Sequence, residues 1–316
     1  MDTGYTGNIM LLPSKLKRNR TNSTPMVTKA RKTAYLFLLP NFLGFAVFTL
    51  LPIIFALGLC FVRWDFSNQM QFIGFNNFLR LFRDETFKIS LYNTIYYTVI
   101  SVPATMVISL VLAVLLNKII KGVKILRTIY FFPYITSMVA VAIVWNMLYN
   151  PSMGPINSFL EAVGVNNPPG WTASSDWAMP AIIIMSVWKQ IGYYMVIYLA
   201  GLQGIPDYLY EAATIDGASS YQKFRYITLP MLTPTTFFVS IMLIIGSFKI
   251  FTQVWVMTEG GPGRASNVLV LYIYRLAFDY FRFGYASAVA MVLFLIVITI
   301  TIIQFKREET WVSYTN

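Results

Sequence analysis

The stretch YEAATIDGASSYQKFRYITLPMLTP (210–234) is a polar island between two long apolar segments. It carries Glu211, Asp216, Lys223 and Arg225 in a chain of which only 12% of the residues are charged. Hydrophobic side chains make up 57% of the 316 residues, and the mean hydropathy is +0.60. This composition is typical of a protein that lies in a lipid bilayer, with the polar island outside it.

Gaps in the charge pattern predict where the chain crosses the bilayer. Gaps longer than the roughly 20 residues that span the hydrocarbon core occur at 33–62, 89–117, 128–160 and 283–305. Two further apolar segments contain one charge each, Lys189 and Lys249. A soluble core would need charged helix faces, which these segments lack. We predict an all-α, polytopic membrane protein with six transmembrane helices, near 35–62, 92–117, 128–149, 178–203, 235–258 and 285–305.

The distribution of basic residues predicts the orientation. The segments that would lie inside the cell carry fifteen Lys and Arg residues, and those that would lie outside carry seven. By the positive-inside rule, both termini are cytoplasmic. We expect a flexible basic tail at 1–34, a membrane domain at 35–305 and a short cytoplasmic tail at 306–316. The net charge of +11 then follows from topology, so a nucleic-acid partner is not needed. The first helix is expected to be a permanent anchor, because 1–34 lacks the features of a secretory signal.

Missing residue types exclude several kinds of chemistry. The sequence has no histidine and one cysteine, Cys60, so the common zinc sites and a disulfide framework are not available. It has no G-x-x-x-x-G-K-[ST] motif, so we expect the chain not to hydrolyse ATP itself. We therefore predict a non-enzymatic membrane subunit with no catalytic residues, no metal and no cofactor of its own.

The polar island has the signals of two short helices around a glycine turn. Pro206 and Asp207 indicate a helix start, and Gly217 a stop that accepts positive φ. A second helix is expected over 220–229, because Pro230 limits its continuation. Such a bracket could dock on another protein, or it could lie on the membrane surface as an interfacial helix pair.

The spacing within the island resembles the EAA loop of permease subunits in binding-protein-dependent ABC importers. Its pattern is Glu-Ala-Ala, three residues, Gly, nine residues, Ile, one residue, Leu-Pro. In that family the loop lies on the cytoplasmic side between the fourth and fifth spans, seats in a cleft of the ATPase subunit and couples ATP hydrolysis to the membrane helices. The resemblance implies an ATPase-coupling set of Glu211, Ala212, Ala213, Asp216, Gly217, Ile227, Leu229 and Pro230.

Other segments are similar to the carbohydrate-uptake branch of these permeases. They include FIGFNNF (72–78), WKQIGYYMVIYLAGLQGIP (188–206) and TEGGPGRAS (258–266), and the resemblance covers roughly 33–307. It implies a translocation subunit in a bacterial inner membrane that takes up an oligosaccharide or a related sugar or polyol. The implied partners are a second permease chain, two ATPase subunits that use ATP and Mg, and an extracellular or periplasmic binding protein.

The two lysines within the predicted spans need an explanation. A charge inside the bilayer costs at least about 2.5–3.5 kcal/mol on insertion scales, so we expect something to compensate each of them. Resemblance to maltose-type permeases implies that the sugar meets the helix before the EAA loop and the helix before the Gly-Gly-Pro turn. The implied substrate path is Trp188, Lys189, Gln190, Tyr193, Ser247, Lys249 and Ile250.

The chemistry of this path leaves the cargo open. If Lys189 and Lys249 act as counter-ions, the cargo is an acidic saccharide such as a uronate oligomer, or a phosphorylated polyol. If they donate to hydroxyl groups, a neutral oligosaccharide fits as well. Alternatively, each lysine sits in a water-filled crevice or snorkels without touching substrate.

Two other classes of function were weighed. An ion-coupled secondary sugar transporter is expected to have a coupling-ion site and often an internal repeat. The predicted spans contain no acidic residue, and no repeat is evident. An intramembrane enzyme would find few acid–base groups in these spans.

Overall fold

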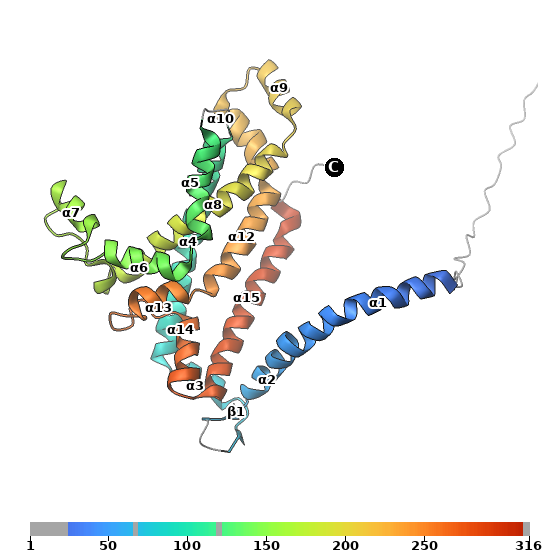
Figure 1. The fold of residues 1–316 in the computed structure, drawn as a ribbon, viewed down its shortest axis with the longest axis vertical. Coiled ribbons are helices and arrows are strands. Elements are labelled where there is room, and N and C mark those ends of the chain that lie inside the picture. The colour runs from blue at the N-terminus through green and yellow to red at the C-terminus, as the bar shows by residue number, and fades with distance from the viewer. Residues whose placement is uncertain (1–24, 66–68, 118–121, 312–316) are drawn as a thin grey trace, which may run out of the picture. The chain divides into compact units, whose positions relative to one another are not determined.

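Helices account for nearly all of the chain that the structure describes (Figure 1). This structure is a computed structural model, and it describes residues 25–65, 69–117 and 122–311. The chain divides into two compact units, 1–54 and 55–316. All the sites discussed below lie within the second unit.

The first unit contains α1 (Pro25–Phe45), a short π-helix η1 (Ala46–Leu50) and the start of α2 (Leu51–Leu59). The large apolar side chains of this unit, such as Phe37 and Phe48, are exposed. Surface of this kind is expected where a helix faces lipid or other membrane helices.

The second unit is a set of helices that carries a single two-stranded ribbon among its described residues. Strands β1 (Val62–Arg63) and β2 (Gln71–Phe72) pair antiparallel, with Val62 opposite Phe72. The helices that follow are α3 (Asn76–Leu81), α4 (Glu85–Leu116), α5 (Val123–Ile135), α6 (Met138–Leu148), α7 (Pro155–Ala162), η2 (Trp171–Ala173), α8 (Ala178–Gln203), α9 (Asp207–Ile215), α10 (Ser220–Lys223), η3 (Phe224–Thr228), α11 (Leu229–Met231), α12 (Thr233–Phe248), α13 (Thr252–Thr258), α14 (Leu269–Tyr274), η4 (Arg275–Asp279) and α15 (Phe283–Trp311).

Within the described part of the chain, four single helices are long and apolar enough to cross a membrane. They are Thr33–Leu59, Glu85–Leu116, Ala178–Gln203 and Phe283–Glu308. Two bent pairs bring the number to six if each pair counts as one span. The molecule is therefore an all-helical polytopic membrane protein with four to six candidate spans.

Two of the six predicted transmembrane helices are broken in the structure. The span expected at 128–149 consists of α5 and α6, which meet at an angle of 99°. The span expected at 235–258 ends at Phe248, and a separate helix, α13, begins at Thr252. At its other end, this span is bent by 62° where α11 meets α12.

The ends of the membrane domain also differ from expectation. Helix α1 begins at Pro25, before the expected start at residue 35, and residues 1–24 of the expected tail lie outside the described residues. Helix α15 continues to Trp311, through part of the expected 306–316 tail.

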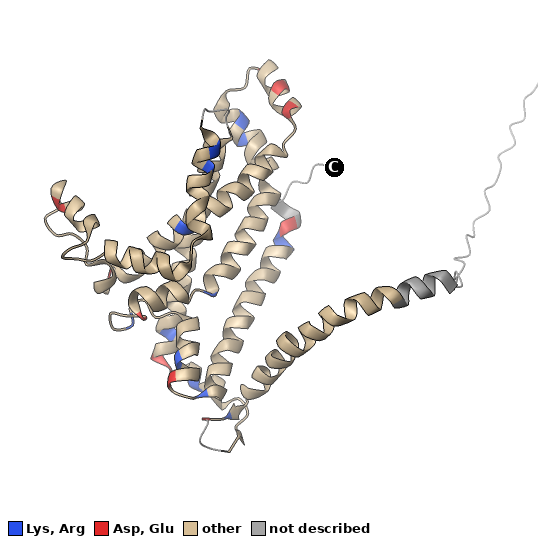
Figure 2. Cartoon of the chain, in the orientation of Figure 1, with Lys and Arg blue, Asp and Glu red and all other residues tan. Residues whose placement is uncertain are grey.

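Helix α4 organises the interior of the second unit, because it packs against both α8 and α12. One apolar core surrounds Tyr97, Ile182 and Val254, and a second surrounds Tyr198 and Val239. Charged residues gather near helix ends, whereas most of the length of α4, α12 and α15 carries none (Figure 2). This pattern is what a bilayer requires of helices that cross it.

Candidate functional site

A cavity of about 210 Å³ lies where the two cores meet. Five helices contribute to it: α4, the start of α6, α8, the end of α12 and the start of α13. Its walls are formed by Tyr97, Ser101, Val102, Thr105, Met138, Gln190, Leu243, Gly246, Ser247, Lys249, Ile250 and Gln253. Amide, hydroxyl and ammonium groups thus converge inside an otherwise apolar unit, as in sites that bind polar ligands.

Helix α4 supplies a wall that the sequence reasoning missed. Tyr97, Ser101 and Thr105 are spaced four residues apart, so they lie on one face of the helix. The hydroxyl of Tyr97 lies among the polar side chains of Gln190, Gln253 and Ser101. The recurring Ser and Thr residues in an apolar helix were the available signal, but nothing local shows which face meets a cavity.

The break after α12 places a lysine at the cavity. Three of the predicted path residues, Ser247, Lys249 and Ile250, come from this break and the turn before it. The hydroxyl of Ser247 donates to the carbonyl of Ile244 at 2.8 Å, a bond within the helix that competes with the backbone ladder. Lys249 is the C-terminal cap of α12, is exposed and lines the cavity.

Lys189 occupies a different environment from Lys249. Its side chain is 5% exposed, and its ammonium group donates to the carbonyls of Pro133, Tyr134 and Thr136 at 2.8, 3.0 and 2.6 Å. These carbonyls belong to the end of α5, where helical carbonyls lose their partners. A positive charge at a helix C-terminus is also favoured by the helix dipole. All three ammonium protons are therefore used to stabilise the break between α5 and α6.

A glycine makes this contact possible. Gly192 lies one helical turn after Lys189, where a Cβ would be only 1.8 Å from the carbonyl oxygen of Tyr130. Any other residue would push α8 away from α5, and the lysine would then no longer reach the carbonyls.

The other two predicted path residues lie away from the cavity walls. Trp188 lines an apolar groove formed by α5 and α6, and its ring is 5.4 Å from that of Trp145. Tyr193 stacks on Tyr134, with ring centroids 4.3 Å apart. The structure thus brings Gln190, Ser247, Lys249 and Ile250 together in one cavity, and leaves Trp188, Lys189 and Tyr193 outside it.

The polar island forms the expected bracket. Helix α9 ends at Ile215, Gly217 has φ of 75°, and α10 begins at Ser220. Ser219 and Gln222 form a capping box at the second helix, which satisfies two amide groups. The predicted helix, glycine turn and second helix are confirmed as local structure.

Two contacts hold the arms of the bracket together. The hydroxyls of Tyr210 and Thr228 are 3.0 Å apart, and the ammonium of Lys223 donates to the hydroxyl of Thr214 at 2.7 Å. The outer surface is unusually apolar for a loop, because Ile215 is 87% exposed. Of the predicted coupling residues, Glu211, Ala212, Asp216 and Gly217 are exposed, and Ala213, Ile227, Leu229 and Pro230 are half-buried.

Known transport proteins are similar to this chain over most of its length. The family model described as "Binding-protein-dependent transport system inner membrane component" matches residues 90–306. The lactose transport system permease protein LacF of Rhizobium radiobacter is 36% identical, over 78% of this chain and 83% of that protein. The sn-glycerol-3-phosphate transport system permease protein UgpA of Yersinia enterocolitica is also 36% identical, over 77% and 83%.

A solved structure is similar over almost the full length. It is a bacterial alginate ABC transporter in complex with an alginate-pentasaccharide-bound periplasmic protein. Its matching chain has a TM-score of 0.80 and 26% identity, with 89% of this chain and 95% of that chain covered. The resemblance inferred from the sequence is confirmed. The chain belongs to the inner-membrane components of binding-protein-dependent transport systems, and it is a non-catalytic, multi-pass permease subunit of a sugar ABC importer.

Proposed function

We propose that this chain is the translocation subunit of an importer whose cargo is a saccharide that carries negative charge. The observation that carries this proposal is Lys249, an exposed residue that lines a cavity whose other polar walls are hydroxyl and amide groups. The amides and hydroxyls suit sugar hydroxyls, and the ammonium suits a carboxylate or phosphate. No Asp or Glu lines the cavity among the described residues.

The substrates named for similar proteins include anionic ones, which supports an anionic cargo. Alginate is named in a similar transporter as an acidic polysaccharide, and glycerol 3-phosphate is a phosphorylated polyol. Lactose, the substrate named for LacF, is neutral. A neutral oligosaccharide is therefore the second candidate, favoured by Tyr97, Gln190 and Gln253, which can serve sugar hydroxyls without any charge.

We assign the counter-ion role to Lys249 alone. Lys189 was expected to share it, but three backbone carbonyls already accept its protons. Bringing Lys189 to a substrate would leave those carbonyls without a donor, at a cost of about 1–3 kcal/mol for each buried group.

The bracket at 207–231 is proposed to dock on an ATPase subunit in the cytoplasm, with both chain termini on the same side. Three features support this role: exposed Ile215, small Ala212 beside it, and the exposed carboxylates of Glu211 and Asp216, which can pair with basic groups of a partner. In this proposal ATP and Mg are bound by two ATPase subunits. A second permease chain and a binding protein outside the membrane complete the importer.

The cavity itself points to a second wall from the partner permease. Its volume of about 210 Å³ is below the roughly 300–1,000 Å³ of typical small-molecule sites. An oligosaccharide would need more room, which a homologous chain facing Lys249 can provide.

Reconstitution of the complete importer in vesicles tests this function. We expect uptake of a uronate oligosaccharide that requires ATP and the binding protein, and we expect this chain to co-purify with an ATPase. Uptake that persists without ATP and follows an ion gradient would contradict it, and would favour the secondary-transporter alternative.

A further inference from the structure

Five arginines line a second cavity in the second unit, separate from the cavity that Lys249 lines. The cavity measures about 610 Å³, and its lining combines the turn before α4, the loop before α14 and the turn before α15. We call it the arginine pocket, after Arg80, Arg83, Arg264, Arg275 and Arg282. The proposed orientation places it outside the cell.

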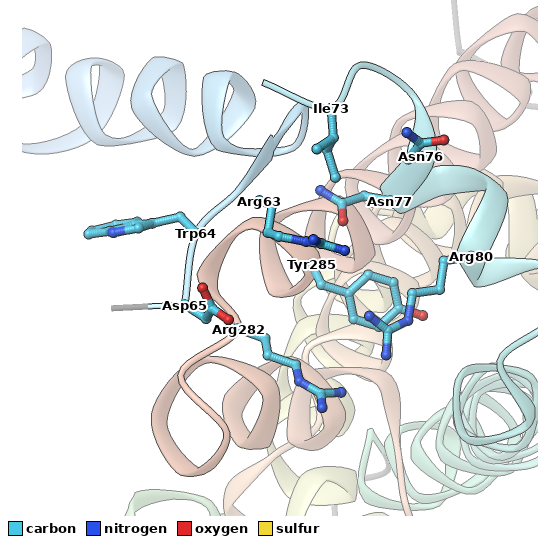
Figure 3. A pocket seen from close by; sticks show the side chains of 9 residues that line it. All are labelled: Arg63, Trp64, Asp65, Ile73, Asn76, Asn77, Arg80, Arg282 and Tyr285. Atoms are coloured by element: carbon cyan, nitrogen blue, oxygen red, sulfur yellow. The ribbon is translucent and has the colours of Figure 1, made fainter. Parts of the chain in front are cut away.

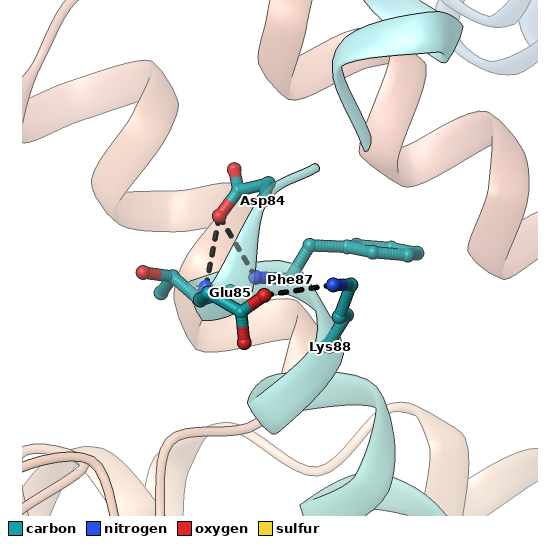
Figure 4. Close-up of polar contacts among 5 residues, drawn as sticks. Asp84, Glu85, Phe87 and Lys88 are labelled. Carbon is teal, nitrogen blue, oxygen red and sulfur yellow. Dashed lines mark hydrogen bonds and ion pairs between the residues drawn. The ribbon is translucent and has the colours of Figure 1, made fainter. Parts of the chain in front are cut away.

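The two carboxylates that line the arginine pocket are already engaged (Figure 4). Asp84 caps α4 by accepting from the amides of Thr86 and Phe87 at 2.9 and 3.1 Å. Its other oxygen accepts from the hydroxyls of Tyr272 and Tyr285 at 2.5 and 2.6 Å. Glu85 forms an ion pair of 2.7 Å with Lys88.

The guanidinium groups, by contrast, lack acidic partners. In the described part of the chain, no salt bridge joins any of the five arginines to a carboxylate. Each guanidinium presents five N–H donors in a planar fork that matches a carboxylate or phosphate. Five such groups around one cavity repel one another unless an anion enters it.

Two of the arginines are held in place by other protein groups. Arg275 donates to the backbone carbonyl of Glu259 at 2.5 Å. Arg80 lies over the ring of Tyr285, 4.7 Å from its centroid, and the hydroxyl of that tyrosine is fixed by Asp84. The pocket is therefore partly preorganised, which lowers the entropy cost of binding.

A smaller pocket adjoins the arginine pocket. Arg63, Arg80 and Arg282 line it around Tyr285, together with one carboxylate, that of Asp65 (Figure 3). Because Arg80 and Arg282 line both pockets, an acidic oligosaccharide can contact guanidinium groups of both pockets along its length.

Helix α4 links the arginine pocket to the cavity beside Lys249. Its first turn, at Thr86, lines the pocket, and Tyr97 lines the cavity about 17 Å further along the helix. Ser90, Asn93 and Thr94 lie between these points, where they are buried and hydrogen-bonded to protein groups, including the loop before α14.

We propose that the arginine pocket binds carboxylate groups of an acidic oligosaccharide on the outer side of the membrane, before the sugar reaches the cavity. The inference rests on the proposed function, because it takes both the orientation and the acidic cargo from it. The guanidinium groups would bind the carboxylates of successive uronate units. Lys249 would bind the carboxylate of the first unit that reaches the cavity.

The test is a binding measurement on the whole importer in nanodiscs of phosphatidylcholine, without added binding protein. The probes are labelled tetragalacturonate and, as a neutral sugar of equal length, maltotetraose. The main variant is Arg83→Gln/Arg264→Gln, which removes two exposed guanidinium groups. Arg83→Lys/Arg264→Lys keeps the charge without the fork, and Lys124→Gln/Lys306→Gln removes two exposed charges that line neither pocket.

We expect the main variant to bind tetragalacturonate roughly 3- to 30-fold more weakly, with maltotetraose unaffected. The lysine pair should recover part of the loss, and the distant control should bind like the wild type. Unchanged tetragalacturonate binding would overturn the inference, and so would an equal loss for both probes. The affinity of the same variants for the binding protein is measured in a separate titration. If only that affinity falls, the pocket is a protein dock and the inference fails.

Two further arms separate the remaining explanations. A loss seen only in nanodiscs with phosphatidylglycerol would assign the pocket to lipid headgroups and overturn the inference. ATP-driven uptake of tetragalacturonate is measured in parallel. Arginine-dependent binding without such uptake contradicts the proposed function alone, whereas uptake with unchanged binding contradicts the pocket alone.

Discussion

Lys189 and Lys249 are the same residue type in the same kind of apolar segment, yet the protein treats them differently. Lys189 is buried, and three carbonyls at the end of α5 accept hydrogen bonds from its ammonium group. Lys249 is exposed at a break in the helix and lines a cavity. A charge in a membrane helix is thus no sign of a binding site until its partners are known. The first lysine stabilises a helix break, and the second is available to a ligand.

The largest expected effect comes from Lys189→Met. Removing the ammonium leaves three carbonyls without a donor, at about 1–3 kcal/mol for each group that stays buried. We expect a lower melting temperature and a lower yield of the assembled importer. Lys249→Met makes the same chemical change at the exposed position, and its stability should stay within about 0.5 kcal/mol of the wild type. Equal melting temperatures for the two variants would break the comparison.

Gly217→Val is expected to have the next largest effect, and it touches neither lysine. A φ of 75° strains a β-branched residue by on the order of 1–3 kcal/mol, although no atom lies within 4 Å of an added Cβ. Transport of acidic and neutral sugars should fall together while the protein still inserts into the membrane. Gly217→Asn is the matched control, since asparagine tolerates this conformation. Normal transport and normal substrate-stimulated ATPase activity in Gly217→Val would exclude the turn as a hinge.

Gln190→Leu sharpens the comparison, because Gln190 follows Lys189 in sequence but shares the cavity with Lys249. Loss of a neutral hydrogen bond of about 0.5–1.5 kcal/mol should weaken sugar uptake roughly two- to tenfold, equally for acidic and neutral sugars. Gln190→Leu should not lower the melting temperature as Lys189→Met does. A loss of stability with unchanged apparent affinity would place Gln190 with the structural lysine instead.

The smallest expected effect concerns Asp84, a charge satisfied within the protein as Lys189 is. Burial opposes its ionisation, but hydrogen bonds from Tyr272, Tyr285 and two backbone amides outweigh that effect and lower its pKa below the ordinary 3.8. The ionised carboxylate therefore stabilises the folded chain above about pH 4, and this contribution is lost as pH falls through the lowered pKa.

Melting temperatures between pH 3 and pH 6 check this prediction. The wild type should lose stability at the acidic end of the range more steeply than Asp84→Asn. Parallel curves for the two proteins would show that Asp84 contributes no pH dependence.

The sequence predicted those features that depend on local pattern. Long gaps between charges located the apolar helices, because lipid excludes charge all along a span. The turn at Gly217 was also predictable, since few other residues accept its φ. The breaks were not. The 99° bend after α5 is accompanied by contacts with Lys189 and Gly192 of another helix, α8, which the sequence of α5 does not show.

Of the candidate site, the part formed by α8 and the end of α12 was predictable from the sequence, and the part formed by α4 was not. Resemblance to the maltose-type permeases pointed to Gln190, Ser247 and Ile250, which do line the cavity. It also pointed to Lys189 and Tyr193, which do not line the cavity, because the direction in which a side chain leaves a helix depends on packing between helices. The α4 wall, from Tyr97 to Thr105, is about ninety residues earlier in the chain than Gln190, and no local signal connects the two.

The most direct test of the central claim is the ratio of acidic to neutral sugar uptake in vesicles that contain the complete importer with Lys249→Met. Tetragalacturonate and maltotetraose compete in the same assay, and uptake is driven by ATP. If Lys249 is the counter-ion, the ratio should fall roughly tenfold or more, as expected for loss of a charge-assisted hydrogen bond. An unchanged ratio, with equal loss of both sugars or loss of neither, would contradict the account.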